Sequence, residues 1–509
     1  MRGLIRNRIL AVVAVVIAVA AAAGLTMLNR SVTLAAGSNA SAPGAAPVGA
    51  VARACPAPGL AGATASRVAV IAGPTASGPG RAEAGRLSTG KSAPLFSVTR
   101  PGALSIARVR PAPAVHAPSP APSAQHIASV PTGGGVVIRA TGSMARGLET
   151  EQVSSEATQS AHCDGPSTDF WFVGPGRSIA AHIRLFLMNT GSQPADVNVE
   201  ADTDAGPLLG SPDTGIAVAP HSMVVQTLDT MLRGSRVIAL HVRTSVGQVV
   251  AAVEETTGTS HGGAWLPAAQ PPATKVVIPG LPSTAGTREL FVTVPGTRDA
   301  HIVLTAVTSK GSYQPTGGGG LDIPAGSAVS VSLPSLGGIP GALRVSSTVP
   351  VTASVLLPGG QHGTPGVFTT ATPPIEQQGM VAVNLGGHGK ASGLVLSAPW
   401  RAARARITEI AEGTTAGTGQ SQAPGSGQTV QIAAKRSLVV KLSPPPGASR
   451  RLAFAVVVTP LAGSGQLYAG RVLAGSGTGG ALLSIQPVSS ALTSVPLPPV
   501  RVALITPAP

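Results

Sequence analysis

Three carboxylates alternate along one short segment, and this spacing is the first feature of the sequence that suggests chemistry. Glu200, Asp202 and Asp204 stand at every second position of the stretch EADTDAG. In a strand they would share one face, and in a loop they resemble the start of a calcium-binding EF-hand. That loop requires glycine at its sixth position, where Pro207 stands when Asp202 is counted first. We therefore expect a solvated strand end and no metal site, with weak calcium binding as the alternative.

The histidines and glycine-rich stretches suggest no enzyme. The histidines are scattered, without a paired ligand spacing such as H-E-x-x-H. Ser260 and His261 lie beside two glycines in a segment that we interpret as a loop. The stretch 386–390 (GGHGK) resembles a phosphate-binding loop but lacks its spacing, since alanine follows Lys390. We expect no catalytic residue, no cofactor and no metal.

Tryptophan is rare in this sequence, so we ask of each tryptophan whether it packs in the core or binds a ligand. Trp171, Trp265 and Trp400 are the only tryptophans of the 509 residues. Sugar-binding modules generally stack pyranose rings on exposed aromatic side chains. The segment 169–172 (DFWF) is better suited to filling a core of small aliphatic side chains. We expect packing as the main role of the rings and ligand stacking as the alternative.

The chain is basic, with a formal net charge of +15. Most of its arginines are separated by alanine and glycine, and the interleaved aromatics of single-strand binders are lacking. We therefore expect no nucleic acid partner. The densest basic stretch is 401–451, where an anionic envelope polymer or lipid is a possible ligand and a solvated face is the alternative. The candidate contacts are Arg401, Arg404, Arg406, Arg450 and Arg451.

An apolar run near the N-terminus predicts where the rest of the chain lies. Arg2, Arg6 and Arg8 precede residues 9–28, which carry no charge and match the ~20 residues of a membrane-spanning helix. Positive charge before such a segment is retained in the cytosol. We expect residues 1–8 in the cytosol, a single span over 9–28 and the remainder outside the cell membrane. Cleavage near residues 38–40, giving a secreted protein, is the alternative.

The two cysteines, Cys55 and Cys163, predict one disulfide. An even number of cysteines in an exported chain most simply pairs. Closing a loop of this length stabilises the fold by about 4–5 kcal/mol in the chain-entropy model. Free thiols or a metal ligand are the alternatives, although zinc requires about four ligands.

Composition and patterning predict an all-β chain behind a proline-rich arm. Residues 29–130 are rich in alanine, proline and serine, with short strand-like pieces at 67–72 and 95–98. From about residue 134, short runs of valine, leucine, isoleucine and threonine alternate with polar residues and are broken by glycine or proline. That pattern is typical of antiparallel sheets.

The β pattern repeats three times. Ser222, Ser327 and Ser437 follow similar alternating strands and precede similar ones. About six strands in ~105 residues is the size of an immunoglobulin-like sandwich, whereas propeller blades are shorter, at about 40–50 residues. We predict three tandem immunoglobulin-like β-sandwiches, at 131–273, 274–378 and 379–509, after the transmembrane helix and the arm at 29–130.

Several of these segments together resemble a known family. They are CPAP at 55–58, Cys163 followed by TDFWF at 168–172, GGAWL at 262–266 and IPGLP at 278–282. The chain resembles the actinobacterial exported proteins of the "domain of unknown function 5719" family, although it has a longer proline-rich insertion before Cys163. The resemblance implies work in the cell envelope beside a membrane glycosyltransferase, and it assigns no catalytic residue.

Two functions compete at this stage. The first is a non-catalytic, membrane-tethered scaffold or accessory protein of the envelope, which contacts an envelope protein through sheet faces or edges. The second is a module that binds anionic envelope polymer or lipid through the basic stretch. A hydrolase whose residues assemble only in space is the third and least favoured.

Overall fold

The computed structural model describes most of the chain between residues 44 and 497. The described residues are 44–56, 66–71, 80–86, 94–98, 127–132, 135–154, 160–208, 215–256, 263–283, 286–334, 336–357, 366–384, 390–411, 427–445, 453–477 and 480–497. The predicted membrane segment 9–28 lies outside them. Within the described residues, no helix is long and apolar enough to span a membrane. The fold described below belongs to the compact unit Pro47–Val495.

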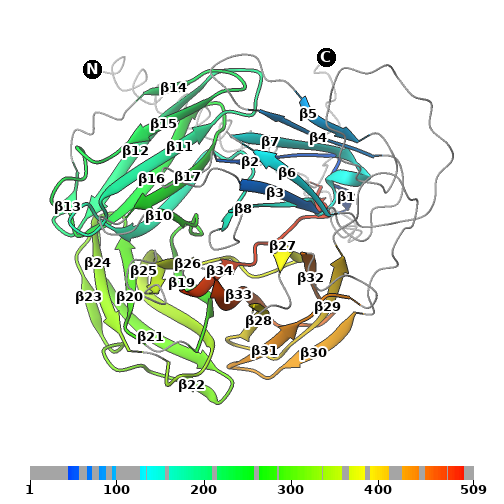
Figure 1. The fold of residues 1–509 in the computed structure, drawn as a ribbon. Coiled ribbons are helices and arrows are strands. Elements are labelled where there is room, and N and C mark those ends of the chain that lie inside the picture. The colour runs from blue at the N-terminus through cyan, green and yellow to red at the C-terminus, as the bar shows by residue number, and fades with distance from the viewer. Residues whose placement is uncertain are drawn as a thin grey trace, which may run out of the picture. The chain divides into compact units, whose positions relative to one another are not determined.

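The all-β prediction is confirmed. The described residues form strands β1 to β35 and one short 3-10 helix, η1 (Ser143–Ala145) (Figure 1). The alternating pattern explains the strands, because side chains in a strand point to opposite faces in turn. In β12 (Ala195–Thr203), for example, Ala195, Val197, Val199 and Ala201 are buried while the residues between them are more exposed.

Strands β2 to β34 form four repeats of one topology, and β1 (Ala45–Pro47) pairs with β35 (Ser494–Pro496). Repeat 1 contains β2 (Ala50–Cys55), β3 (Ser66–Ile71), β4 (Gly80–Arg86), β5 (Pro94–Val98), β6 (Ile127–Thr132), β7 (Val136–Gly142), β8 (Glu149–Ser154) and β9 (Ser160–His162). Repeat 2 contains β10 (Asp169–Pro175), β11 (His182–Met188), β12, β13 (Gly206–Pro207), β14 (Ile216–Val218), β15 (Met223–Thr227), β16 (Val237–Val246), β17 (Val250–Thr256) and β18 (Gly263–Leu266).

Repeats 3 and 4 follow in the same order. Repeat 3 contains β19 (Ala273–Leu281), β20 (Arg288–Val294), β21 (Ala300–Thr308), β22 (Gly311–Tyr313), β23 (Leu321–Ile323), β24 (Ser327–Leu333), β25 (Gly341–Leu357) and β26 (Val367–Thr370). Repeat 4 contains β27 (Gly379–Asn384), β28 (Lys390–Ala398), β29 (Ala403–Ala411), β30 (Gln428–Ile432), β31 (Arg436–Leu442), β32 (Phe454–Pro460), β33 (Tyr468–Gly477) and β34 (Gly480–Pro487).

Each repeat consists of two antiparallel sheets with the same strand order. In repeat 4, one sheet has the order β27-β32-β29-β30 and the other β31-β28-β33-β34. Repeats 1 and 2 have the equivalent orders. In repeat 3 the single long strand β25 supplies two positions, since its first part pairs with β19 and β21 and its second part with β20 and β26. In repeats 2 and 4 the inward faces of the two sheets enclose a core of mostly aliphatic side chains with a few phenylalanines.

The immunoglobulin-like prediction holds only for the central strands. In repeat 4, β28 pairs with β31 and β29 pairs with β32, as strands B and E and strands C and F do in an immunoglobulin domain. The flanking strands differ. The first strand of the repeat, β27, lies beside β32, and β33 lies beside β28, so these two strands have exchanged sheets relative to the immunoglobulin order.

The predicted division of the chain differs from the observed one at its N-terminal end. We expected residues 29–130 to be an arm and 131–273 to be one sandwich, but β6 to β9 pair with β2 to β5 to complete repeat 1. The proline-rich stretch 111–123 falls in the connection between β5 and β6. Because this stretch is rich in proline and alanine, the sequence around it did not indicate a repeat, although strands of repeat 1 precede and follow it.

The turns before β15, β24 and β31 are equivalent, and they show that the sequence alignment of the repeats needs one correction. His221, Gly326 and Lys435 all have positive φ, at 52°, 63° and 57°, in equivalent turns of repeats 2, 3 and 4. Ser222 and Ser327 each follow that residue and donate a hydrogen bond to the carbonyl three residues earlier. Arg436 is the residue that follows Lys435, so the predicted alignment of Ser437 is wrong by one position.

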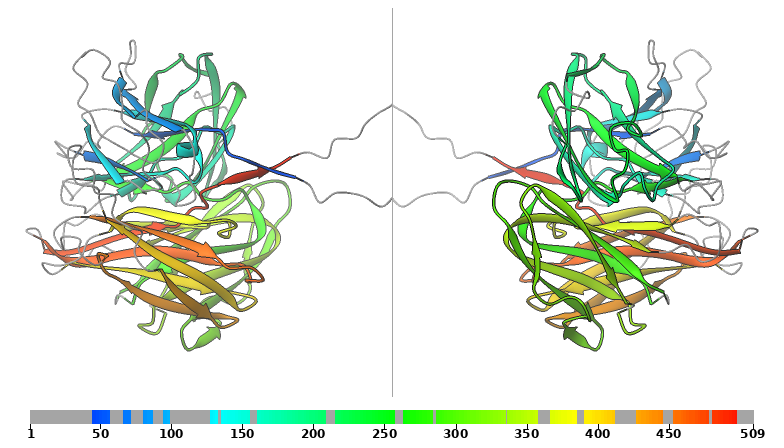
Figure 2. Two further views of the ribbon diagram at one scale, coloured as in Figure 1. Left: turned by 90° about the vertical axis from the view of Figure 1, so that its right-hand side faces the viewer. Right: turned by 90° about the vertical axis from the view of Figure 1, so that its left-hand side faces the viewer.

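The four repeats pack against one another in a closed series of contacts within Pro47–Val495. Consecutive repeats share apolar contacts, and repeat 4 in turn packs against repeat 1. Figure 2 shows repeats 3 and 4 side by side, in yellow-green and orange-red. Between repeats 4 and 1 the buried contact includes Ala69, Ile71 and Val153 on one side and Met380 and Val457 on the other. Every repeat therefore has two neighbours.

Candidate functional site

A cavity of about 80 Å³ lies where the last strands of all four repeats meet. Strands β9, β18, β26 and β34 each contribute to its lining. Its volume is several times the ~10–15 Å³ that one water molecule requires. The polar and aromatic residues of the lining include Ser160, His162, Asp164, Trp265, Phe368, Thr372, Ser484 and Gln486.

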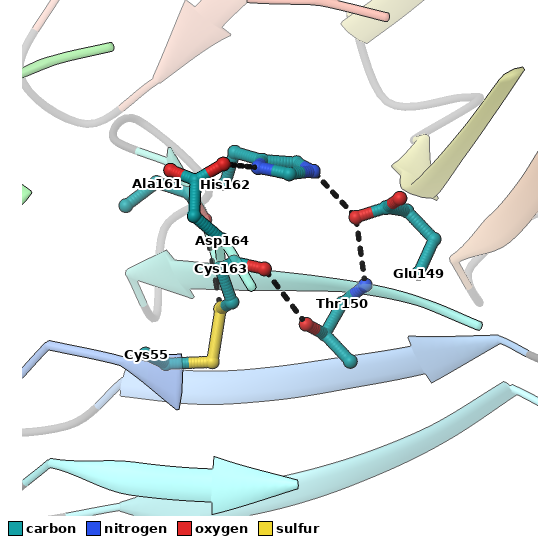
Figure 3. The surroundings of a disulfide bond; sticks show 7 residues. All are labelled: Cys55, Glu149, Thr150, Ala161, His162, Cys163 and Asp164. Carbon is teal, nitrogen blue, oxygen red and sulfur yellow. Dashed lines mark hydrogen bonds and ion pairs between the residues drawn. A yellow bond between two sulfur atoms is a disulfide. The ribbon is translucent and has the colours of Figure 1, made fainter. Parts of the chain in front are cut away.

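The disulfide lies close to this cavity and belongs to repeat 1. Cys55 at the end of β2 is bonded to Cys163, which directly follows β9, with 4.6 Å between their Cα atoms (Figure 3). Both cysteines are fully buried. The predicted pairing of Cys55 with Cys163 is confirmed, and the bond joins the first strand of repeat 1 to the residue that follows its last strand.

His162 lies between two carboxylates beside the disulfide. Its Nδ1 is 2.9 Å from Asp164 Oδ1, and its Nε2 forms an ion pair with Glu149 Oε1 (Figure 3). Burial alone would lower the pKa of His162, but the negative charges of Glu149 and Asp164 outweigh it and raise this pKa to about 10. The imidazole is therefore protonated at neutral pH, and both of its nitrogens face carboxylates.

Ser160, His162 and Asp164 resemble a hydrolytic triad in composition but not in geometry. Ser160 and His162 lie on β9, Asp164 follows two residues after its end, and all three line the cavity. A triad requires the imidazole to accept the serine proton. Here the Ser160 hydroxyl accepts a hydrogen bond from Arg471, 3.2 Å away, and the imidazole of His162 is occupied by its two carboxylates. This arrangement suits an ion cluster that stabilises the fold.

A second buried ion pair connects repeat 4 to repeat 1. Arg471 on β33 lies 2.6 Å from Glu151 Oε1 on β8, and both side chains are 1% exposed. Glu151 also accepts a hydrogen bond from the Val383 amide at 3.0 Å. Burial raises the pKa of Glu151, and the positive charge of Arg471 opposes this shift. The pair spans the interface at which the series of repeats closes.

The predicted basic surface is only partly within the described residues. Arg401, Arg404 and Arg406 are exposed, and the last two project from alternate positions of β29. Arg404 also donates a hydrogen bond to the Ala462 carbonyl at 3.3 Å. Arg450 and Arg451 lie outside the described residues. Three of the five arginines predicted to contact an anionic ligand are thus exposed among the described residues.

The three alternating carboxylates, Glu200, Asp202 and Asp204, each interact with a different partner. Glu200 is 3.4 Å from His241 Nδ1, and Asp202 accepts a hydrogen bond from Thr293 of repeat 3 at 3.3 Å. Asp204 caps backbone amides of the loop before β16. In the part of the chain that the structure describes, no group of three His, Cys, Asp or Glu side chains is arranged to hold a metal ion.

The tryptophans differ in their surroundings. Trp171 is 6% exposed and stacks on His241, with 3.8 Å between ring centroids. Trp400 lies 5.7 Å from Tyr468 at the contact between repeats 3 and 4. Trp265 and Trp400 are both partly buried, and Trp265 is the one of the three that lines the central cavity.

Two further sequence motifs lie at the ends of strands and in the connections that follow them. Residues 85–92 (GRLSTGKS) have phosphate-loop spacing, and residues 258–262 (GTSHG) have the spacing of a nucleophile elbow. Each of these motifs normally leads from a strand into a helix. Here the first joins the antiparallel strands β4 and β5, and the second joins the antiparallel strands β17 and β18. Neither motif therefore has the strand-to-helix setting in which it binds phosphate or presents a nucleophile.

Among the comparisons with known proteins, only the comparison with protein-family models gives a match. A family model described as "Family of unknown function (DUF5719)" matches residues 121–443, which is more than half of the chain. The match begins shortly before β6 and ends just after β31, so it covers parts of repeats 1 and 4 and all of repeats 2 and 3. No curated protein and no solved structure matches the chain.

Proposed function

Because this chain belongs to the DUF5719 family, whose function is unknown, we propose from its architecture that it is a non-catalytic scaffold or accessory protein of the cell envelope. Residues 9–28 tether it to the membrane, and the bulk of the chain lies on the extracytoplasmic side. Its partner is a membrane or envelope protein, such as a glycosyltransferase. The actinobacterial setting is part of the same proposal.

The closed series of repeats is the observation that carries this proposal. Four repeats held by apolar contacts and by the Arg471–Glu151 pair favour a single rigid body. Each sheet also ends in edge strands, such as β30 and β31, whose free backbone groups are suited to pairing with another chain. Rigidity together with several edges is what a docking platform requires.

Two further features support the extracytoplasmic placement. The arginines before residues 9–28 favour retention of the N-terminus in the cytosol. A buried disulfide between Cys55 and Cys163 is favoured by an oxidising compartment, such as the outside of the cell. Both features agree on which side of the membrane the four repeats lie.

In-cell crosslinking of the full chain followed by mass spectrometry tests the scaffold proposal. We expect membrane or envelope proteins among the crosslinked partners, and fewer of them when residues 9–28 are replaced by a cleavable signal sequence. Recovery of no envelope protein, combined with turnover of a wall glycan or ester by the purified protein, contradicts the proposal.

A second candidate function rests on the exposed arginines of β29. We infer that Arg401, Arg404 and Arg406 offer an anionic polymer or lipid a row of positive charges. Such binding weakens steeply with salt, because exposed charges are screened over ~8–10 Å at physiological ionic strength. Protein docking through sheet edges largely survives the same salt. Sedimentation with anionic vesicles at low and physiological salt therefore separates the two functions.

A further inference from the structure

We propose that the side of the compact unit Pro47–Val495 at which the chain enters and leaves contacts the lipid surface of the membrane. We call this side the entry surface and define it as residues 47–49 together with residues 492–495. The inference rests on the proposed tether at residues 9–28, and it adds which side of the body lies on the membrane.

The first and last residues of the unit lie side by side. The Val48 amide donates a hydrogen bond to the Thr493 carbonyl at 3.0 Å, and the Gly49 carbonyl accepts one from the Gly142 amide at 2.8 Å. The chain therefore enters and leaves the unit at neighbouring points. A tether at residues 9–28 consequently attaches to the body at this surface.

The C-terminal part of the entry surface is held in place from both sides. Gln377 accepts hydrogen bonds through Oε1 from the Thr493 amide at 2.7 Å and from the Ser494 amide at 3.0 Å. Its Nε2 donates to the Ser494 carbonyl at 2.8 Å. From repeat 1, the Gly147 amide donates to the Leu492 carbonyl at 2.8 Å. The side chains exposed here thus belong to a fixed segment and not to a frayed end.

Exposed apolar side chains are concentrated on this surface. Leu492 is 43% exposed and Val495 is 40% exposed. Of the nine large hydrophobic side chains that are exposed among the described residues, three lie within residues 492–497, and the other six are spread over residues 179–439. Such a cluster marks a contact with a membrane or with another protein.

The sequence on either side of the entry surface favours lipid as the occupant. Residues 31–52 and 472–500 contain no Asp, Glu, Lys or Arg. A charged side chain loses water when it enters the boundary of a bilayer, which is costly, whereas uncharged segments avoid that cost. An uncharged surface with exposed leucine and valine is therefore suited to lie against lipid.

The length of the tether also selects the membrane. Only the 18 residues 29–46 separate the predicted span from Pro47, and 18 residues reach at most about 60 Å when fully extended. A compact unit of the size of Pro47–Val495 has a radius of gyration of about 22 Å and is thus roughly 60 Å across. The opposite side cannot reach the bilayer, because the tether would have to pass around the whole body. The entry surface is always within reach.

Tethering makes a small apolar contact sufficient. A few partly exposed side chains bind a free vesicle weakly. Attachment to the bilayer turns the same contact into an intramolecular step with a high effective concentration. The contact is therefore expected in the membrane-inserted full chain, where it orients the four repeats.

Fluorescence quenching in reconstituted membranes tests this inference. The full chain is placed in phosphatidylcholine vesicles that contain a lipid spin-labelled near its headgroup. A fluorophore is attached at Gly49→Cys, where an added side chain meets open space. Val225→Cys and Val439→Cys, at exposed positions of β15 and β31, are the reference sites. We expect the spin label to remove most of the fluorescence at position 49 and much less at the reference sites. Equal quenching at all three positions overturns the inference.

A pair of charge substitutions tests the apolar contact itself. Leu492→Asp with Val495→Asp should restore most of the fluorescence at position 49, because the new charges keep this surface in water. Val225→Asp with Val439→Asp adds the same charge at similarly exposed positions and should leave position 49 quenched. If the first pair of substitutions also leaves position 49 quenched, the tether alone holds the surface near the bilayer, and the apolar contact is refuted.

Flotation of the vesicles after a carbonate wash separates this inference from the proposed tether. A chain that is washed off contradicts the tether and, with it, the contact. A chain that stays in the vesicles without quenching at position 49 contradicts the contact alone and leaves the scaffold proposal standing. In that case, crosslinks in cells from position 492 to an envelope protein would assign the entry surface to a protein partner.

Discussion

At the scale of single residues, His162 contributes a defined part of the pH dependence of stability. Its pKa is raised from 6.5 to about 10 in the folded protein by Glu149 and Asp164, which outweigh its burial. A raised pKa means that the folded state holds this proton more tightly than the unfolded chain does. The stabilisation is complete below pH 6.5 and is lost as the pH rises through 10. We expect the denaturant midpoint to fall across that window, and His162→Gln should remove this part of the slope.

The residues around His162 show what sequence could and could not predict. Cys55 and Cys163 are the only two cysteines of the sequence, so one disulfide between them was the simplest expectation. The contacts of His162 could not be expected in this way, because they depend on strand register. The pairing of β8 with β9 places Glu151 opposite His162 and brings Glu149 within reach of the ring. Register cannot be obtained from alternation alone, since strands that are shifted by two residues have the same pattern.

At the scale of elements, the turn before β31 stores local strain. Lys435 has φ 57°, a conformation that costs about 1–2 kcal/mol for a residue with a side chain, and Gly326 occupies the equivalent turn of repeat 3. Lys435→Gly should therefore stabilise the protein by about 0.5–1 kcal/mol, since part of the gain is lost to the flexibility of glycine. Lys435→Ala is the control for the lost side chain and should change little. Chemical denaturation measures both, and equal effects of the two variants would refute the turn assignment.

The disulfide is the second prediction at this scale, because it connects strands β2 and β9 of one repeat. Replacing both cysteines, as Cys55→Ala with Cys163→Ala, should cost about 4–5 kcal/mol for a separation of 108 residues. Limited proteolysis should then cut first within repeat 1. Cleavage that begins in repeat 3 or 4 would argue against a role confined to repeat 1.

The elements also explain why one repeat escaped prediction. Repeats 2, 3 and 4 were visible because similar strands recur at similar spacing around the turns at 221, 326 and 435. Repeat 1 has the same strand order, but the long connection at 99–126 separates β5 from β6. A search for strand order that tolerated an insertion could have found it. The exchange of the flanking strands between sheets could not have been read from the sequence, because both arrangements bury the same alternating residues.

At the scale of the whole molecule, Arg471 closes the series of repeats. Arg471→Ala leaves Glu151 buried without a counter-charge, which should cost about 3–5 kcal/mol. Replacing both partners, as Arg471→Met with Glu151→Gln, should recover most of that loss, because no buried charge then remains. Chemical denaturation of the three proteins provides the comparison. A double variant that is less stable than Arg471→Ala would show that the charges themselves hold the interface.

We propose that the four repeats of this protein behave as one rigid body, and scanning calorimetry of the full chain in detergent tests this most directly. A single body should unfold in one transition whose calorimetric and van't Hoff enthalpies agree. In Arg471→Ala the transition should move to lower temperature and broaden or split, as repeats 1 and 4 separate first. The contradicting result would be several distinct transitions in the unmodified protein, each with the enthalpy of one repeat and none shifted by Arg471→Ala. Such a result would mean that the four repeats unfold independently of one another.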